Sequence, residues 1–316
     1  MSERESAISF TDQTVVVTGA GRGLGRGYAM EFARRGACVV VNDIRDGGAA
    51  AEAVVRDIEK LGGVAVASSD SVATAEGGQA LIELGQATFG HGISAVVHNA
   101  GMSFSAPFDE AEDAHMDLLL DVHLRGAFFV LRPAWSIMRE QGYGRIVLTS
   151  SSAGAFGRES GTIYGAAKAG LIGLSRALAH EGEKYGIISN CVLPYADTGI
   201  LNDNPLVGAG MTARIMGALS RLRIHGLTIE SVVPLVTFMA SEACLEGGRA
   251  YWACAGRYAE VFTGLTDGWS SGRVEGVGAE EIAQHLDEIQ DRRTFTTPHS
   301  IADELEAEIA KLLEQN

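Results

Sequence analysis

The segment YGAAK places a phenol at Tyr164 and an ammonium group at Lys168, four residues apart. On a helix, residues i and i+4 share one face, with their Cβ atoms about 5–6 Å apart. A phenol has an ordinary pKa near 10, and lowering it by about three units requires roughly 4 kcal/mol. One positive charge about 4 Å away supplies that energy at an effective dielectric constant near 20. The pair is therefore a candidate general acid/base with an electrostatic partner, and the alternative is a helix that simply exposes both side chains.

A glycine-rich segment, TGAGRGLG at 18–25, follows an apolar run and precedes a helical pattern. Without Cβ atoms, backbone N–H groups and the positive end of the helix dipole can approach a pyrophosphate. We predict a dinucleotide-binding turn, and a tight turn without a ligand is the alternative. The expected cofactor contacts in this loop are Gly19, Arg22, Gly23, Leu24 and Gly25.

Asp43 ends the second apolar run, where a carboxylate can accept hydrogen bonds from both hydroxyls of an adenosine ribose. The same carboxylate would repel a 2′-phosphate, which carries nearly two negative charges. This position favours NAD over NADP, although Arg22 and Arg45 are each able to reach a 2′-phosphate. Asp70 closes the third run and is a candidate adenine contact, with a solvated turn as the alternative.

Short apolar runs that alternate with helical patterns must position these residues. Val and Ile fill both faces of the runs, which is typical of a parallel sheet covered by helices. The expected strands are 14–19, 37–43, 64–68, 94–100, 144–150, 187–194 and 249–253, and the expected helices are 24–35, 49–61, 76–89, 113–140 and 162–185. These repeated units predict a doubly wound, Rossmann-type α/β fold with a parallel seven-stranded sheet.

We expect a single domain that carries a C-terminal extension. Residues 1–255 would form the dinucleotide-binding catalytic domain, with a lid at about 195–226, and residues 256–316 would pack on the same domain as a polar extension. From 204 to 229 the chain has no acidic residue, although it contains Arg214, Arg221 and Arg223. This basic run suits an anionic substrate tail such as the phosphates of CoA, and a solvated helix face is the alternative.

Composition and charge limit the class of protein. The net charge of −15 argues against nucleic acid or an anionic membrane as the main partner. No apolar run reaches the length that crosses a membrane, and MSERESAISF lacks a signal-peptide core. The 4 cysteines have no metal-ligand spacing. We therefore predict reduced thiols, no metal site and a cytoplasmic location.

Four motifs in order resemble those of the short-chain dehydrogenase/reductase family, over roughly residues 10–255. They are TGAGRGLG, HNAG at 98–101, SSSAGAFG at 150–157 and YGAAK. Ser151 precedes Tyr164 by the interval of the family's catalytic serine. The resemblance implies that Ser151, Tyr164 and Lys168 are catalytic and that Lys168 also binds the nicotinamide ribose. The further cofactor contacts that it implies are Ser71, Asn99, Ala100, Gly101 and Thr198.

Two histidines depart from the usual motifs of this family. His98 stands in the place of an Asn in HNAG, and we expect it to make a hydrogen bond in the core. His123 in HLRG replaces an Asn that supports a proton-relay water, so either a structural role or a supporting role beside the site fits. We interpret Ser150 and Ser152, which flank the catalytic serine, as buried structural hydroxyls.

Within the family, the segments VVVND, DVHLRGAFFVLRPAW and YGRIVLTSSSAG look like the (3R)-hydroxyacyl-CoA dehydrogenase domains of type 2 peroxisomal multifunctional enzymes and their bacterial relatives. Some of those relatives act on steroid acyl-CoA thioesters. The resemblance implies NAD-dependent oxidation of a 3-hydroxyacyl-CoA, with a steroid side-chain acyl-CoA among the possible substrates, and Tyr164 as general base. It also implies a homodimer or homotetramer, which the Ala- and Gly-rich segment 164–185 suits.

Three rival hypotheses remain open at this point. The first is a dehydrogenase of a hydroxysteroid or another secondary alcohol. The second is an NADP-dependent ketoacyl reductase, which depends on Arg22. The third is a non-catalytic NAD(H)-binding sensor that keeps the glycine loop.

Overall fold

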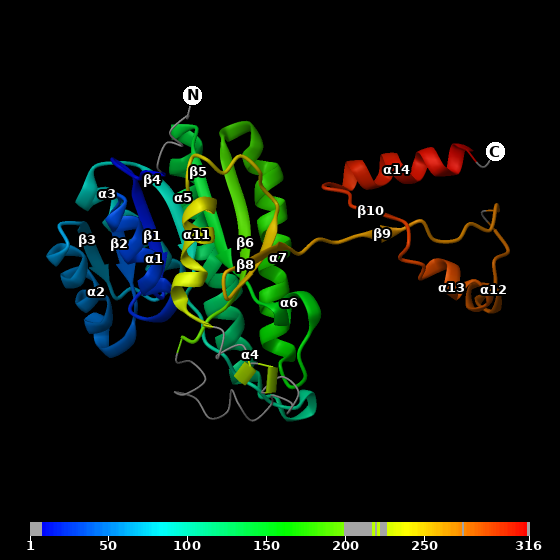
Figure 1. The fold of residues 1–316 in the computed structure, drawn as a ribbon, viewed down its shortest axis with the longest axis horizontal. Helices are drawn as coiled ribbons and strands as arrows, with labels where there is room; N and C mark the ends of the chain where they lie inside the picture. Colours follow the sequence, from blue (N-terminus) through cyan, green and yellow to red (C-terminus); the bar gives the residue numbers. More distant parts are fainter. Residues whose placement is uncertain (1–7, 199–216, 219, 222–225, 274, 315–316) are drawn as a thin grey trace. The chain divides into compact units, whose positions relative to one another are not determined.

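The computed structural model describes residues 8–198, 217–218, 220–221, 226–273 and 275–314. It divides into two compact units, Met1–Glu260 and Val261–Asn316. In the first unit, helices cover both faces of one sheet (Figure 1). Most of the predicted lid lies outside the described residues, including Arg214 and Arg223. Arg221 is described and is exposed.

The sheet of the first unit has eight strands in the order β3-β2-β1-β4-β5-β6-β7-β8. Seven of them are parallel, and β8 pairs with β7 in the antiparallel direction. The strands are β1 (Thr14–Thr18), β2 (Cys38–Asn42), β3 (Val64–Ser68), β4 (Ile93–His98), β5 (Gly144–Thr149), β6 (Ile187–Tyr195), β7 (Ala250–Cys254) and β8 (Arg257–Glu260). The predicted doubly wound α/β fold is confirmed, with one strand more than we expected.

The additional strand β8 comes from the segment that we assigned to the extension. Ala255 and Gly256 both have positive φ, 48° and 77°, and join β7 to β8 as a two-residue hairpin turn. All four residues of β8 are exposed. The strand therefore lacks the apolar run that marks the buried strands, and periodicity could not reveal it.

Two layers of helices cover the sheet (Figure 1). They are α1 (Gly23–Arg34), α2 (Ala49–Lys60), α3 (Ala75–Phe89), α4 (Asp113–Leu120), α5 (Gly126–Gln141), α6 (Ser152–Phe156), α7 (Thr162–Gly182) and α11 (Val233–Met239). Helix α1 packs against α2 and α11, and α3 packs against α5. Tyr28 and Phe32 of α1 join Val15 and Val17 of β1 in one buried cluster, so alternate residues of the central strand face this layer.

The predicted helix 113–140 is interrupted in the structure. Helix α4 ends at Leu120, a π-helical turn spans Asp121–Arg125, and α5 then continues to Gln141. Such turns are rare inside α-helices and often lie at functional sites. This turn carries His123, which is 1% exposed and lies among the residues that line the cavity described below.

The topology switches direction at β1, which lies between β2 and β4. In open α/β sheets, ligands bind outside the carboxyl ends of the strands at such a switch point. Gly19, Asp43, Asn99 and Ser150 are the residues that directly follow β1, β2, β4 and β5. The sheet therefore gathers four of the sequence motifs at one edge.

The second unit contains short elements of its own. They are the antiparallel strands β9 (Leu265–Thr266) and β10 (Phe295–Thr296) and the helices α12 (Ala279–Gln284), α13 (Leu286–Ile289) and α14 (Ile301–Glu314). The rings of Phe262 and Phe295 stack beside the strand pair, with centroids 5.8 Å apart. Residues 256–260 of the predicted extension form the turn and strand β8 of the first unit, and the packing of residues 261–316 on the catalytic domain stays a prediction.

Candidate active site

A cavity of about 700 Å³ opens at the carboxyl ends of the strands. Its lining includes the three predicted catalytic residues and most of the predicted cofactor contacts. The predicted residues that line it are Gly19, Arg22, Gly23, Leu24, Asp43, Ser71, Asn99, Ala100, Gly101, Ser151, Tyr164, Lys168 and Thr198. Gly25 and Asp70 are not among the lining residues.

The glycine loop closes tightly over β4. Gly19 has a φ of +62°, and a Cβ atom there would lie 2.7 Å from the Cα of Ala100. A Cβ at Gly25 would lie 2.2 Å from the carbonyl oxygen of Gly19, so Gly25 packs the turn rather than facing the cavity. Helix α1 begins at Gly23 with no side-chain cap on its N–H groups. This arrangement fits a pyrophosphate, because the backbone N–H groups at the start of α1 have no side-chain cap and the neighbouring glycines have no side chain to keep an anion away from them.

The Asn99 side chain holds the start of the glycine loop in place through hydrogen bonds to its backbone. Its Nδ2 donates to the carbonyl oxygens of Thr18, at 3.2 Å, and Gly19, at 3.1 Å. The backbone N–H groups of Asn99 and Ala100 both donate to the Thr18 hydroxyl at 3.0 Å. A side chain so occupied positions the loop, which agrees with our interpretation of Asn99 as a residue that supports the backbone near the cofactor.

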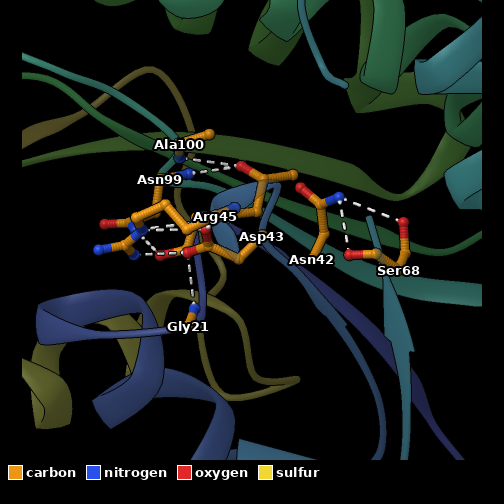
Figure 2. Close-up of polar contacts among 9 residues, drawn as sticks. Gly21, Asn42, Asp43, Arg45, Ser68, Asn99 and Ala100 are labelled. Carbon is orange, nitrogen blue, oxygen red and sulfur yellow. Dashed lines mark hydrogen bonds and ion pairs between the residues drawn. The ribbon is translucent and has the colours of Figure 1, made fainter. Parts of the chain in front are cut away.

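Asp43 directly follows β2 and is 5% exposed. Figure 2 shows its contacts with Gly21 and Arg45. Its Oδ2 accepts from the N–H of Gly21 at 2.9 Å and from Nη2 of Arg45 at 2.6 Å. Burial raises the pKa of Asp43. The hydrogen bonds from Arg45, the charge of Arg45 and the hydrogen bond from the Gly21 N–H lower it by more, so the pKa lies below its ordinary value. Asp43 is thus an anion near neutral pH.

Arg22 is exposed at the start of α1, and burial and the charge of Arg45 lower its pKa.

Asp70 braces the strand ends rather than facing the cavity. Its Oδ2 accepts from Ser68 Oγ at 2.9 Å, and its carbonyl oxygen accepts from Nδ2 of Asn42 at 2.8 Å. Figure 2 shows the same Asn42 amide reaching Ser68. An adenine contact for Asp70 stays a prediction.

The three predicted catalytic residues converge in the same cavity. Ser151 caps α6, and its Oγ accepts from the N–H of Ala153 at 3.1 Å. Tyr164 lies in the first turn of α7, close enough to Ser151 for that hydroxyl to lower the pKa of the phenol. Nζ of Lys168, one turn further, lies 5.7 Å from the centre of the Tyr164 ring and donates to the carbonyl oxygen of Thr149 at 2.6 Å. The spacing of YGAAK thus brings phenol and ammonium together beside the glycine loop.

A family model described as short chain dehydrogenase matches residues 13–204. The chain belongs to the short-chain dehydrogenase family. The chain is 41% identical over 258 residues to the mouse peroxisomal multifunctional enzyme type 2, an alignment that covers 79% of this chain and 33% of the mouse protein. It is 35% identical over 265 residues to the hydroxyacyl-CoA dehydrogenase ChsB1 of Mycobacterium tuberculosis, covering 76% of each. The match to peroxisomal multifunctional enzyme type 2 of Drosophila melanogaster has a TM-score of 0.79 at 29% identity, and covers 97% of this chain and 50% of the fly protein.

This short-chain dehydrogenase is an oxidoreductase that acts on CH–OH groups, and its family uses nicotinamide cofactors. It spans about a third of the mouse multifunctional enzyme and half of the fly one. All four cysteines are free thiols, and in the described ranges no three His, Cys, Asp or Glu side chains gather to hold a metal ion. No helix among the described residues has the length and apolar character that a membrane span requires.

The electrostatics of the short-chain dehydrogenase site differ from our expectation. Burial raises the pKa of Tyr164, and the Ser151 hydrogen bond and the charge of Arg158 only partly oppose this effect. Burial also lowers the pKa of Lys168 to about 7. We expected Lys168 to lower the pKa of the phenol. Since Lys168 is 3% exposed, the desolvation that brings it beside the phenol also weakens its own charge.

Burial of Lys168 should make stability depend on pH. An unfolded lysine keeps its proton to about pH 10, so between pH 7 and 10 the unfolded chain binds more protons than the folded one. The free energy of unfolding should therefore rise with pH over that range, relative to Lys168→Met. Urea unfolding of both proteins at pH 7 and pH 10 measures this difference. The exposed Lys184→Met is the matched control, and an equal pH response in all three proteins would contradict the prediction.

The two histidines form a neutral buried network next to the catalytic pair. The His98 Nε2 and the His123 carbonyl oxygen are 3.1 Å apart, and the His123 Nε2 lies 2.7 Å from the carbonyl oxygen of Met102. Burial lowers the pKa of His98 to about 4 and, with the charge of Lys168, holds that of His123 well below its ordinary value. His98 makes the core hydrogen bond that we expected. His123 also packs edge-on against Tyr164, at 5.4 Å between ring centroids.

Two further predicted residues, Thr198 and Ser71, also line the cavity. Thr198 lies over the glycine loop, where a Cβ at Gly23 would be 3.2 Å from the Thr198 Cβ. Ser71 follows β3, and its Oγ accepts from the N–H of Ala73 at 3.3 Å. Sequence analysis missed Arg158 and Tyr195, which also line the cavity. The signal for Arg158 was a lone cation between the serine segment and YGAAK.

Proposed function

We propose that this protein oxidises a 3-hydroxyacyl-CoA to the 3-oxoacyl-CoA with NAD. The convergence of Ser151, Tyr164 and Lys168 in one cavity with the glycine loop carries the proposal. The name of the relative ChsB1, a hydroxyacyl-CoA dehydrogenase, supports the substrate class. Membership of a dehydrogenase family disfavours the alternative of a non-catalytic NAD(H) sensor.

The roles of the three side chains follow from their hydrogen bonds. The bound nicotinamide would supply the hydride acceptor. Ser151 uses its Oγ lone pair to accept from Ala153, which leaves its O–H to donate to the substrate oxygen. Tyr164 takes the hydroxyl proton as general base. Lys168, held at the Thr149 carbonyl oxygen, would bind the nicotinamide ribose and stabilise the phenolate.

Asp43 supports NAD as the cofactor. Its carboxylate is ionised, and four N–H donors from Gly21 and Arg45 hold it at the end of β2, where an adenosine ribose would lie. A 2′-phosphate there would meet this negative charge. Arg22 and Arg45 are the opposing features, but Arg45 is already paired with Asp43 at 2.6 Å. The Arg45 guanidinium is therefore engaged by the Asp43 carboxylate.

The deciding experiment compares oxidation rates of 3-hydroxyacyl-CoA esters of rising acyl bulk, each with NAD and with NADP. We expect the highest kcat/KM for a CoA ester with NAD, because the cavity of about 700 Å³ is large and Asp43 is anionic. Matched free secondary alcohols, including a hydroxysteroid, serve as controls. Faster turnover of the free alcohols would favour the first rival hypothesis, and a preference for NADP would favour the second.

The remaining expectations concern the assembly. We still predict a homodimer or homotetramer formed through segment 164–185. The division into a catalytic domain of residues 1–255 and an extension at 256–316 also stays a prediction.

A further inference from the structure

Arg158 lies in the loop between α6 and α7, seven residues after Ser151, and lines the cavity. The loop turns sharply on either side of it, since Gly157 has a φ of 76° and Ser160 a φ of 54°. A serine in the left-handed region persists only where its surroundings hold it. Here the carbonyl oxygen of Ser160 accepts from the N–H of Ala106 at 3.0 Å. The loop therefore holds Arg158 at a defined place.

The guanidinium of Arg158 is fixed on one side. Its Nη2 donates to Ser105 Oγ at 2.9 Å and to the carbonyl oxygen of Phe104 at 3.4 Å. Its Nε lies against Gly161, where an added Cβ would come within 2.6 Å. Gly161 has an ordinary negative φ of −124°, so the space that it leaves is occupied by the arginine. The backbone and a hydroxyl thus orient this side chain before any ligand binds.

The charge of Arg158 has no acidic partner among the described residues. Within the same ranges its Nε is buried and makes no hydrogen bond. An unmet buried donor costs about 1–3 kcal/mol, and more where the group is charged. The Nε atom lies against Gly161 and is closed to a ligand, but Nη1 also makes no hydrogen bond among the described residues and is not buried. A ligand oxygen in the cavity could therefore accept from Nη1, where partial burial weakens the competition from water.

Arg158 lies directly beside the reacting group. Its Cζ is 5.5 Å from the centre of the Tyr164 ring, and the ring of His123 borders the same phenol. In a 3-hydroxyacyl substrate, one carbon separates the C3 carbinol, at Tyr164 and Ser151, from the C1 acyl carbon. The phosphates of CoA lie a whole pantetheine arm further away. A cation this close to the phenol therefore meets the acyl group and not the phosphates.

We propose that Arg158 binds the C1 acyl oxygen and so selects substrates that carry a carbonyl or carboxyl group two carbons from the reacting carbinol. The proposal deepens the proposed function and rests on its placement of the carbinol at Tyr164. Both the carbonyl of a thioester and the carboxylate of a free 3-hydroxy acid present this oxygen. Arginine suits either one, because its fork donates several hydrogen bonds in one plane.

The test uses the full-length protein with NADH and a pair of short ligands that lack phosphates. One is the acetoacetyl thioester of N-acetylcysteamine, and the other is the matched thioether in which CH₂ replaces the C1 carbonyl. We expect the wild type to favour the 1,3-dicarbonyl ligand by about 10–100-fold in kcat/KM for reduction, the range for a hydrogen bond to a charged group. Arg158→Ala should lose this preference because its kcat/KM should fall for the thioester and stay unchanged for the thioether.

Two further variants keep the result interpretable. Gly161→Ala displaces the guanidinium while retaining its charge, so it should also weaken the preference. Arg139→Ala removes an exposed arginine of α5 and should leave it unchanged. Free acetoacetate, tested alongside, distinguishes a carboxylate from a thioester as the recognised group.

Three results would overturn the proposal. They are a preference for the thioester that survives in Arg158→Ala, an equal loss of kcat/KM for both ligands in that variant, and no preference in the wild type. Failure of the proposed function has a different signature. If CoA esters react no better than their truncated thioesters, the CoA assignment fails, while a preference that depends on Arg158 still supports this subsite.

Discussion

Replacing Tyr164 with phenylalanine should lower kcat for alcohol oxidation by about 10²–10⁴-fold, the usual contribution of a general acid/base. The change removes one oxygen atom and leaves the ring that packs against His123 in place. Binding of NADH should therefore change little, because the glycine loop, Asn99 and Asp43 are untouched. Steady-state kinetics measure the first quantity, and a fluorescence titration with NADH measures the second.

Tyr185→Phe is the matched control for this prediction. Tyr185 lies in the turn that follows α7, at the opposite end of the helix from Tyr164, and is not among the residues lining the cavity. It should retain wild-type kcat. Unchanged turnover in Tyr164→Phe would remove the general-base assignment, and with it the proposed mechanism.

The pKa directions indicate when the proton transfer becomes favourable. Burial raises the pKa of Tyr164 and lowers that of Lys168, so it favours the neutral form of both groups. Two opposing influences on the phenol remain, the Ser151 hydrogen bond and the charge of Arg158. An oxidised nicotinamide would bring a further positive charge. We infer that the phenol becomes an effective base only with the cofactor beside it.

Much of the fold could be predicted because its signals are local. Strands such as β1 and β2 are runs of Val that are buried on both faces, and the glycine loop needs missing Cβ atoms at Gly19 and Gly25. Each of these requirements is met by the residue types at a few adjacent positions. The juxtaposition of Tyr164 and Lys168 was predictable for the same reason, since one helical turn fixes it.

What the sequence did not reveal depends on contacts between distant residues. The π-helical turn at Asp121–Arg125 leaves no signal in hydrophobic periodicity, which continues through it. The position of Arg158 depends on Phe104 and Ser105, more than fifty residues earlier in the chain. The sign of the pKa shift of Tyr164 depends on how deeply the fold buries the phenol, and spacing alone carries no such information.

Three consecutive serines allow a sharp test of the hydroxyl that contacts the substrate. Ser151→Ala should lower kcat by about 10²–10³-fold, the effect of removing one donor to a developing oxyanion. The expected cause is specific, because Ser151 Oγ already accepts from the N–H of Ala153, and its single O–H is the group that would donate to the substrate oxygen. Steady-state rates with the best substrate measure the loss, and circular dichroism checks that the fold is kept.

The neighbouring serines provide the matched controls. Ser150 is 2% exposed and donates to the carbonyl oxygen of Lys168 at 2.7 Å, so Ser150→Ala should lower the free energy of unfolding by about 1 kcal/mol. Ser152 Oγ is buried and has no hydrogen-bond partner among the described residues, so Ser152→Ala should be close to neutral in both measurements. An equal loss of kcat in all three variants would mean that the segment acts through its backbone. A loss confined to Ser152→Ala would move the catalytic hydroxyl by one residue.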